Sequence, residues 1–172
     1  MLPNFGNRII LRRLALVDLP AFQSYRHDPE VGRYQGWQPI PDEEASQFLS
    51  EMSTAELFLT GHWTQIGIAD RTNQLIGDIG IFINGGSVSA EIGFTLNRSY
   101  QGLGLAAEAV REAIRLIFRS TPVEKVLAVT DARNRACIRL LERLKMTKTK
   151  TVEAMFRGEP CQEHHYELLR PQ

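Results

Sequence analysis

Apolar residues recur with a helical period in four parts of this chain. From residue 103 to 118 they return every three or four positions, at Leu103, Ala106, Val110, Ile114 and Ile117, which predicts an amphipathic helix. Residues 18–28, 42–52 and 134–144 are expected to form three further helices of the same kind. Acidic residues in the first turn of the 42–52 segment favour a helix start there.

Seven other segments are rich in β-formers or alternate between apolar and polar residues. These predicted strands are residues 8–14, 63–69, 74–83, 88–96, 124–130, 147–155 and 161–169. A turn from Asn84 to Ser87 is expected to join two of them as a hairpin. The helix at 103–118 connects strands 88–96 and 124–130, and a crossover of this length makes those two strands parallel. We therefore predict a single α/β domain over residues 1–172, with a mostly antiparallel central sheet of about six or seven strands flanked by helices.

Two glycines, Gly102 and Gly104, precede the central helix. A helix N-terminus carries unpaired N–H groups and a partial positive charge, and glycine lets a ligand approach the backbone closely. The segment therefore suits a phosphate or pyrophosphate group. The alternative is a tight turn whose glycines serve only the chain path. The spacing matches neither a P-loop nor a dinucleotide fingerprint, because Leu105 follows Gly104 and a third glycine is missing.

The segment Gln101–Ala106 fits the pattern Gln/Arg-x-x-Gly-x-Gly/Ala, and so resembles the acyl-CoA pyrophosphate signature of the GCN5-related N-acetyltransferases (GNAT). Together with residues 90–94 and 100–109 it is similar to the branch that acetylates the N-termini of ribosomal proteins. Residues 134–144 resemble the second motif of the family, whose Asn meets the pantetheine arm. The alternative for Asn134 is a helix N-cap alone. In the second motif, Lys145 and Met146 replace the usual Gly-Phe.

The resemblance implies acetyl-CoA as co-substrate and an amine as acceptor, bound in one ternary complex. It places the parallel strand pair at the cofactor site and implies that backbone N–H groups of residues 94–96 polarise the thioester, where the family's strand bulges. Homodimers are common in the family. The residues that it assigns to the cofactor are Phe94, Thr95, Leu96, Gln101, Gly102, Leu103, Gly104, Leu105, Ala106 and Asn134.

Glu91 is the candidate base. It shares a strand face with Gly93, which leaves space beside the carboxylate, and partial burial would raise its pKa and suit it to accept a proton. The alternative is a structural glutamate. Cys137 stands where the nearer branch has serine, and it is the candidate acid that protonates the leaving thiolate. The alternative for Cys137 is a core cysteine on the apolar helix face.

The acceptor side is expected to include Tyr34, Trp37 and His164. Tyr34 and Trp37 lie in an aromatic segment broken by glycines and proline, which suits one wall of a binding cleft. The alternative is a lid packed on the edge of the core. His164 and His165 are adjacent in a predicted strand, so one of them faces each side of the sheet.

Composition narrows the functional classes. Lys plus Arg and Asp plus Glu each number 20 in 172 residues, so no net charge attracts nucleic acid or a membrane surface. No apolar run approaches the roughly 20 residues of a membrane-spanning helix, and we expect no signal peptide. Cys137 and Cys161 are the two cysteines, which is typical of reduced cytoplasmic thiols, and no ligand spacing suggests a metal.

The sequence thus predicts an acetyl-CoA-dependent N-acetyltransferase that acts on a primary amine: a protein N-terminus, an amino acid or a small molecule. Two alternatives stay open. One is a non-catalytic acyl-CoA-binding or sensor protein on the same fold, because the second motif is altered and its helix lacks the tyrosine that some branches use as acid. The other is a transferase for a different acyl group, such as succinyl.

Overall fold

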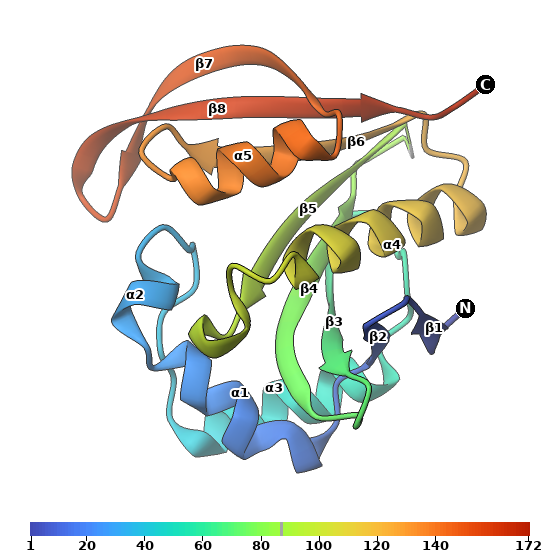
Figure 1. Ribbon diagram of the computed structural model, residues 1–172, viewed down its shortest axis with the longest axis vertical. Helices are drawn as coiled ribbons and strands as arrows, with labels where there is room; N and C mark the ends of the chain where they lie inside the picture. Colours follow the sequence, from blue (N-terminus) through green and yellow to red (C-terminus); the bar gives the residue numbers. More distant parts are fainter. Residues whose placement is uncertain (87) are drawn as a thin grey trace.

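A twisted sheet runs through the computed structural model (Figure 1), which describes residues 1–86 and 88–172. Within these residues the sheet has eight strands in the order β1-β2-β3-β4-β5-β6-β8-β7. The strands are β1 (Asn4–Phe5), β2 (Ile9–Arg13), β3 (Trp63–Asp70), β4 (Leu75–Ile83), β5 (Ser89–Leu96), β6 (Lys125–Asp131), β7 (Thr147–Phe156) and β8 (Glu159–Leu169). The helices are α1 (Leu19–Arg26), α2 (Pro29–Gly32), α3 (Asp42–Thr54), α4 (Leu105–Ser120) and α5 (Arg135–Arg143), with short 3-10 turns η1 (Leu16–Asp18) and η2 (Arg98–Tyr100).

The pairing of strands confirms the predicted fold class. Neighbouring strands are antiparallel except β5 and β6, which are parallel and joined through α4. The parallel pairing extends only from Ser89 opposite Lys125 to Ile92 opposite Ala128. Beyond Ile92, β5 stays paired with β4 and no longer with β6. The sheet therefore opens between β5 and β6 at the carboxyl end of the parallel pair, where open sheets bind ligands.

Two apolar clusters hold the helices against the sheet. The larger cluster joins the strands to the buried face of α4, for which Val110, Ala113 and Ile117 are fully covered. The smaller one joins α1 and α3 to the sheet around Phe22 and Leu49. The helix predicted from the apolar period is thus confirmed in α4, and its apolar face packs against the core.

The ends of the elements differ from the prediction in a few places. Helix α4 begins at Leu105, and Leu103 is 58% exposed, because the left-handed backbone of Gly104 interrupts the helix before it. The short elements β1 and α2 were not predicted, since two and four residues carry no recognisable period. In the expected hairpin turn, Asn84 N donates to Ser89 O, and Ser87 lies outside the described residues.

Helix α5 ends in a regular way although Lys145 and Met146 replace the Gly-Phe of the second motif. Lys145 has a φ of 64°, its N–H donates to Glu142 O, and Met146 N donates to Leu141 O. These bonds form a Schellman motif, in which glycine is the usual left-handed residue. Lys145 therefore takes the conformation of the glycine that it replaces, and Met146 is buried in the core.

Candidate active site

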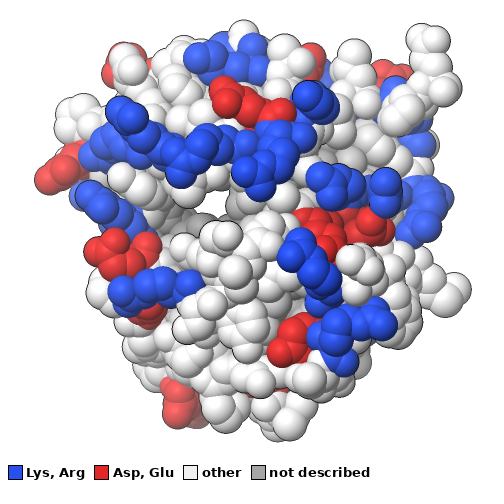
Figure 2. Space-filling view, viewed as in Figure 1, with Lys and Arg blue, Asp and Glu red and all other residues white. Residues whose placement is uncertain are grey.

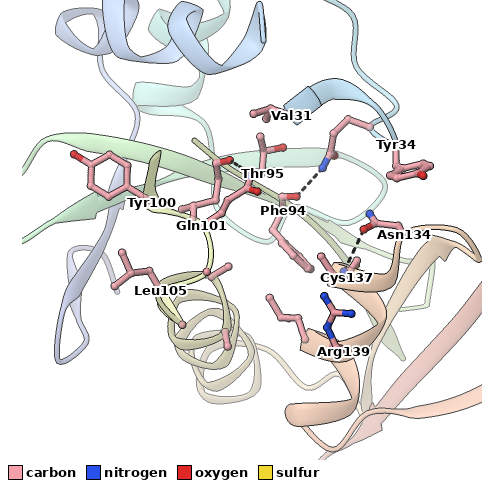
Figure 3. A pocket seen from close by; sticks show the side chains of 18 of the residues that line it. Val31, Tyr34, Phe94, Thr95, Tyr100, Gln101, Leu105, Asn134, Cys137 and Arg139 are labelled. Atoms are coloured by element: carbon pink, nitrogen blue, oxygen red, sulfur yellow. Dashed lines mark hydrogen bonds between the residues drawn. The ribbon is translucent and has the colours of Figure 1, made fainter. Parts of the chain in front are cut away.

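A cavity of about 430 Å³ lies where β5 separates from β6, bounded by the α2 segment, the start of α4 and one side of α5. Figure 3 shows its side chains, and Figure 2 shows a hollow in the surface with basic side chains along its rim. Its lining includes most of the predicted cofactor residues, namely Phe94, Thr95, Leu96, Gln101, Gly102, Gly104, Leu105, Ala106 and Asn134. Leu103 is the exception, for it points to solvent just before the helix begins.

The start of α4 is shaped as a cradle for an anion. Gly102 and Gly104 have φ values of 76° and 79°, which side chains rarely tolerate, and Gly104 is the N-cap without a side-chain cap. The 16-residue helix directs its positive dipole end and free N–H groups to this point. Arg8 braces the loop, because Nη1 donates to Leu103 O at 2.8 Å and Nε donates to Glu108 at 3.0 Å.

The free edge of β5 forms another wall. Phe94 O accepts from Gln35 Nε2 at 3.0 Å, and Leu96 O accepts from Gln101 Nε2 at 2.9 Å. In a strand, the N–H and C=O of one residue point to the same edge. The N–H groups of Phe94 and Leu96 therefore face the opening. The β4–β5 register runs without a shift, so this opening arises from the separation of β5 from β6 and not from a bulge against β4.

Asn134 and Cys137 lie together at the start of α5 (Figure 3). Asn134 caps the helix, with Oδ1 accepting from Cys137 N at 3.2 Å, and it also lines the cavity. The two interpretations of Asn134 are thus compatible, because capping engages Oδ1 and leaves Nδ2 for a ligand. Cys137 is half-buried at the cavity wall. Burial raises the pKa of its thiol, against a smaller opposing effect of a hydrogen bond with Thr130, so the thiol is protonated at neutral pH.

The cavity residues that were not predicted from the sequence include two arginines of α5, Arg139 and Arg143. Both are exposed, and with Arg135 they stand at every fourth position of α5, which places them on one side of the helix. This spacing of arginines along one helix face is the sequence pattern that could have predicted them. Guanidinium groups pair well with phosphate oxygens. The cavity therefore offers α5 arginines on one side and the α4 helix start on another.

Glu91 is absent from the described lining of this cavity and is half-buried on the face of β5 opposite to that of Phe94. Thr95, on the same face, bonds Trp37, and an added Cβ at Gly93 would meet open space. Burial raises the pKa of the Glu91 carboxyl, a nearby charge on His165 lowers it, and Glu163 raises it. The carboxylate is thus partly desolvated beside open space, which are the properties that a base needs.

The two adjacent histidines face opposite sides of the sheet, as predicted. Glu91 pairs with Leu127, and Leu127 pairs with Glu167, so Glu167 and the alternate residue His165 share the face of Glu91. His164 faces the opposite way and is 3.0 Å from Thr151 Oγ1 through Nδ1. His165 is therefore the histidine on the face of Glu91. Among the described residues its buried Nε2 has no hydrogen-bond partner, and it lies 3.9 Å from Glu163 Oε2.

Tyr34 and Trp37 take different positions in the segment after α2. Tyr34 lines the cavity (Figure 3). Trp37 is absent from the described lining and instead donates from Nε1 to Thr95 Oγ1 at 3.1 Å, with its ring 4.5 Å from the Arg26 guanidinium. This geometry gives Trp37 a packing role that fastens the segment to β5, which corresponds to the lid alternative.

No helix in the described part of the chain has the length and apolarity to span a membrane, and no group of three metal-binding side chains occurs there.

Comparison with known proteins identifies the family. A family model described as an acetyltransferase (GNAT) domain matches residues 8–147. The uncharacterized N-acetyltransferase p20 of Bacillus licheniformis is 31% identical over 146 residues, which cover 84% of this chain and 82% of that protein. A GNAT acetyltransferase from Bacillus anthracis superposes with a TM-score of 0.84 at 21% identity and 96% coverage of both chains.

A second solved structure is that of RimL, a ribosomal L7/L12 alpha-N-protein acetyltransferase in complex with coenzyme A. It superposes with a TM-score of 0.81 at 16% identity and 97% coverage of both chains. At these identities the two structures establish the fold, whereas the family model and the p20 relative establish the family. The resemblance seen in the sequence is thereby confirmed, and this chain belongs to the GNAT acetyltransferase family.

Proposed function

We propose that this protein transfers the acetyl group of acetyl-CoA to a primary amine by direct transfer in a ternary complex. In this reaction a C–N amide bond forms and the C–S thioester bond breaks. The amine loses one proton to a base, and the departing thiolate takes up one proton. The observation that carries the proposal is the single cavity that joins the uncapped start of α4, the free edge of β5 and the α5 arginines.

Each wall of the cavity suits a different part of acetyl-CoA. The N–H groups around Gly102 and Gly104 and the side chains of Arg139 and Arg143 would hold the phosphates. The free N–H groups of Phe94 and Leu96 would bond the pantetheine arm and polarise the thioester carbonyl.

We assign the two proton transfers to Glu91 and Cys137. Glu91, on the same face of β5 as Thr95, would accept the amine proton directly or through water, and its raised pKa supports this role. Cys137, a protonated thiol at the cavity wall, would supply a proton to the thiolate. A cytoplasmic site of action and a homodimer stay predictions from the sequence.

The test is calorimetric titration of the protein with acetyl-CoA, beside two charge-reversed variants. Arg143→Glu alters an exposed cavity residue, and Arg111→Glu makes the same change on an exposed part of α4 outside the cavity lining. We expect micromolar binding, a loss of about tenfold or more in Arg143→Glu, and little change in Arg111→Glu. No binding by the unaltered protein would remove the basis of the proposal.

Turnover is then measured as CoA release over a panel of amines, with acetyl-CoA and succinyl-CoA as donors. Release with acetyl-CoA and at least one amine supports the transferase. Binding without release across the panel would support the acyl-CoA-binding alternative. Preferential release with succinyl-CoA would support the transferase for another acyl group.

A further inference from the structure

A second cavity, of about 290 Å³, adjoins the first at Arg33 and Tyr34, which line both. Its lining is Arg33, Tyr34, Arg133, Phe156, Arg157 and Glu159. The residues come from three separate places: the segment after α2, the loop between β6 and α5, and the turn between β7 and β8. Figure 1 shows this last turn reaching toward α2. We call this cavity the arginine pocket.

The arginine pocket has an excess of positive charge, since three guanidinium groups face one carboxylate. Each guanidinium retains donors for a ligand. Arg33 is exposed and has no carboxylate partner among the described residues. Arg133 donates to Asp131 through Nε and Nη2, which leaves Nη1. Arg157 uses Nη2 for backbone carbonyls of the α2 segment, which leaves Nε and Nη1.

Aromatic rings hold these arginines in position. The ring of Tyr34 lies 5.4 Å from the Arg33 guanidinium and 5.7 Å from that of Arg133, and the ring of Phe156 lies 4.8 Å from that of Arg157. The bonds from Arg157 to Gly32 O at 2.9 Å and Gln35 O at 3.1 Å join the β7–β8 turn to the α2 segment. The donors are thus held in place before a ligand arrives, which lowers the entropy cost of binding.

We propose that the arginine pocket binds the anionic group of the amine acceptor, so that the preferred acceptors are small amines that carry a carboxylate or a phosphate. This inference rests on the proposed transferase function. Arginine forks match the geometry of both anions. The volume is near the lower limit of small-molecule sites, which fits a group of amino-acid size. A polyamine would bring further positive charge to this pocket and would be disfavoured.

The first experiment compares acceptors with and without an anionic group. CoA release is measured for glycine, β-alanine and phenylalanine beside their amides, and for phosphoethanolamine beside ethanolamine. We expect kcat/KM to favour the anionic member by about tenfold or more, mainly through KM. The amino-acid and phosphoethanolamine arms distinguish carboxylate from phosphate. Equal use of charged and uncharged members would overturn the inference and leave the transferase function intact.

Two variants test whether Arg33 produces the preference for anionic acceptors. Arg33→Gln removes the unpaired guanidinium, and Arg111→Gln makes the same change outside both cavity linings. We expect Arg33→Gln to abolish most of the preference for the anionic acceptor, and Arg111→Gln to keep it. If Arg33→Gln instead weakens acetyl-CoA binding and keeps the preference, Arg33 serves the cofactor phosphates and the inference is wrong.

A binding measurement tests the arginine pocket even if the protein acetylates none of the amines. The protein, with and without CoA, is titrated calorimetrically with phosphoethanolamine, ethanolamine, β-alanine and its amide. Tighter binding of the anionic member, lost in Arg33→Gln, supports the arginine pocket even if no amine is acetylated. Equal binding within both pairs would overturn it. The experiments therefore distinguish failure of the arginine-pocket inference from failure of the proposed transferase function.

Discussion

Glu91 on β5 and His165 on β8 lie on one face of the sheet with a single strand, β6, between them, and a charge on His165 lowers the pKa of the Glu91 carboxyl. The largest effect on that pKa is burial, which raises it. The pKa of the carboxyl is thus raised by burial and by Glu163, and lowered by His165. This arrangement makes the pH dependence of the enzyme a direct test of the assignment of Glu91.

We predict that Glu91→Gln lowers kcat with little change in acetyl-CoA affinity, because the amide cannot accept a proton. A base works only when deprotonated, so the rate of the unaltered protein should fall as pH falls through a pKa above the ordinary glutamate value. The measurement is kcat/KM against pH for both proteins. An identical acid limb in Glu91→Gln would contradict the role of base.

The same substitution has a predicted effect on stability with a definite sign. The folded pKa of Glu91 is raised, so the fold favours the protonated form, and the ionised form destabilises the protein at neutral pH. Glu91→Gln should therefore raise the free energy of unfolding slightly at pH 7. This difference should vanish as pH falls below the unfolded pKa of glutamate. Urea unfolding at pH 7 and pH 4 compares the two proteins.

We predict that His165→Gln moves the acid limb of the pH–rate profile to higher pH, because the charge that lowers the pKa of Glu91 is removed. His164→Gln is the matched control, since His164 faces the other side of the sheet. The limb should stay in place for the control. A shift in His164→Gln with none in His165→Gln would reverse the assignment of the two residues.

Lys145→Gly should stabilise the protein by about 1 kcal/mol, because glycine adopts the left-handed conformation at φ 64° without the strain of a Cβ. Lys145→Ala removes the charge and keeps the Cβ, so it separates the two effects. The measurement is the urea midpoint of each variant. A gain in Lys145→Ala equal to that in Lys145→Gly would attribute the effect to charge.

The local parts of the site could be predicted from the sequence. The glycine turn, the strand before it and the cap at Asn134 depend on neighbouring residues, and these lie where the patterns placed them. The histidine that faces Glu91 depends on the β6–β8 register, which no local pattern specifies. The arginine pocket depends on a contact between Arg157 and Gly32, 125 positions apart. Long-range pairing therefore sets the proposed acceptor side, and helix and turn chemistry set most of the proposed cofactor side.

A buried ion pair, Arg26 with Asp78, contacts Trp37 in the segment after α2. Asp78 is fully buried and accepts hydrogen bonds from Arg26 Nη2 at 2.8 Å, Gln65 Nε2 at 2.6 Å and the Tyr25 hydroxyl. Across the strands it stands opposite Thr95, which receives the bond from Trp37. The stacking of Arg26 against Trp37 links this network to the segment that carries Tyr34.

Asp78→Asn should lower the free energy of unfolding by about 3–5 kcal/mol, because it leaves Arg26 buried without a counter-charge. Glu124→Gln makes the same change of carboxylate to amide on an exposed residue and should stay within about 0.5 kcal/mol of the unaltered protein. Urea unfolding measures both. If Asp78→Asn still folds, it should raise KM for the amine more than it weakens acetyl-CoA binding, since Arg26 stacks on Trp37 in the segment that carries Tyr34 of the proposed arginine pocket. Equal stability of the two variants would show that the pair contributes little.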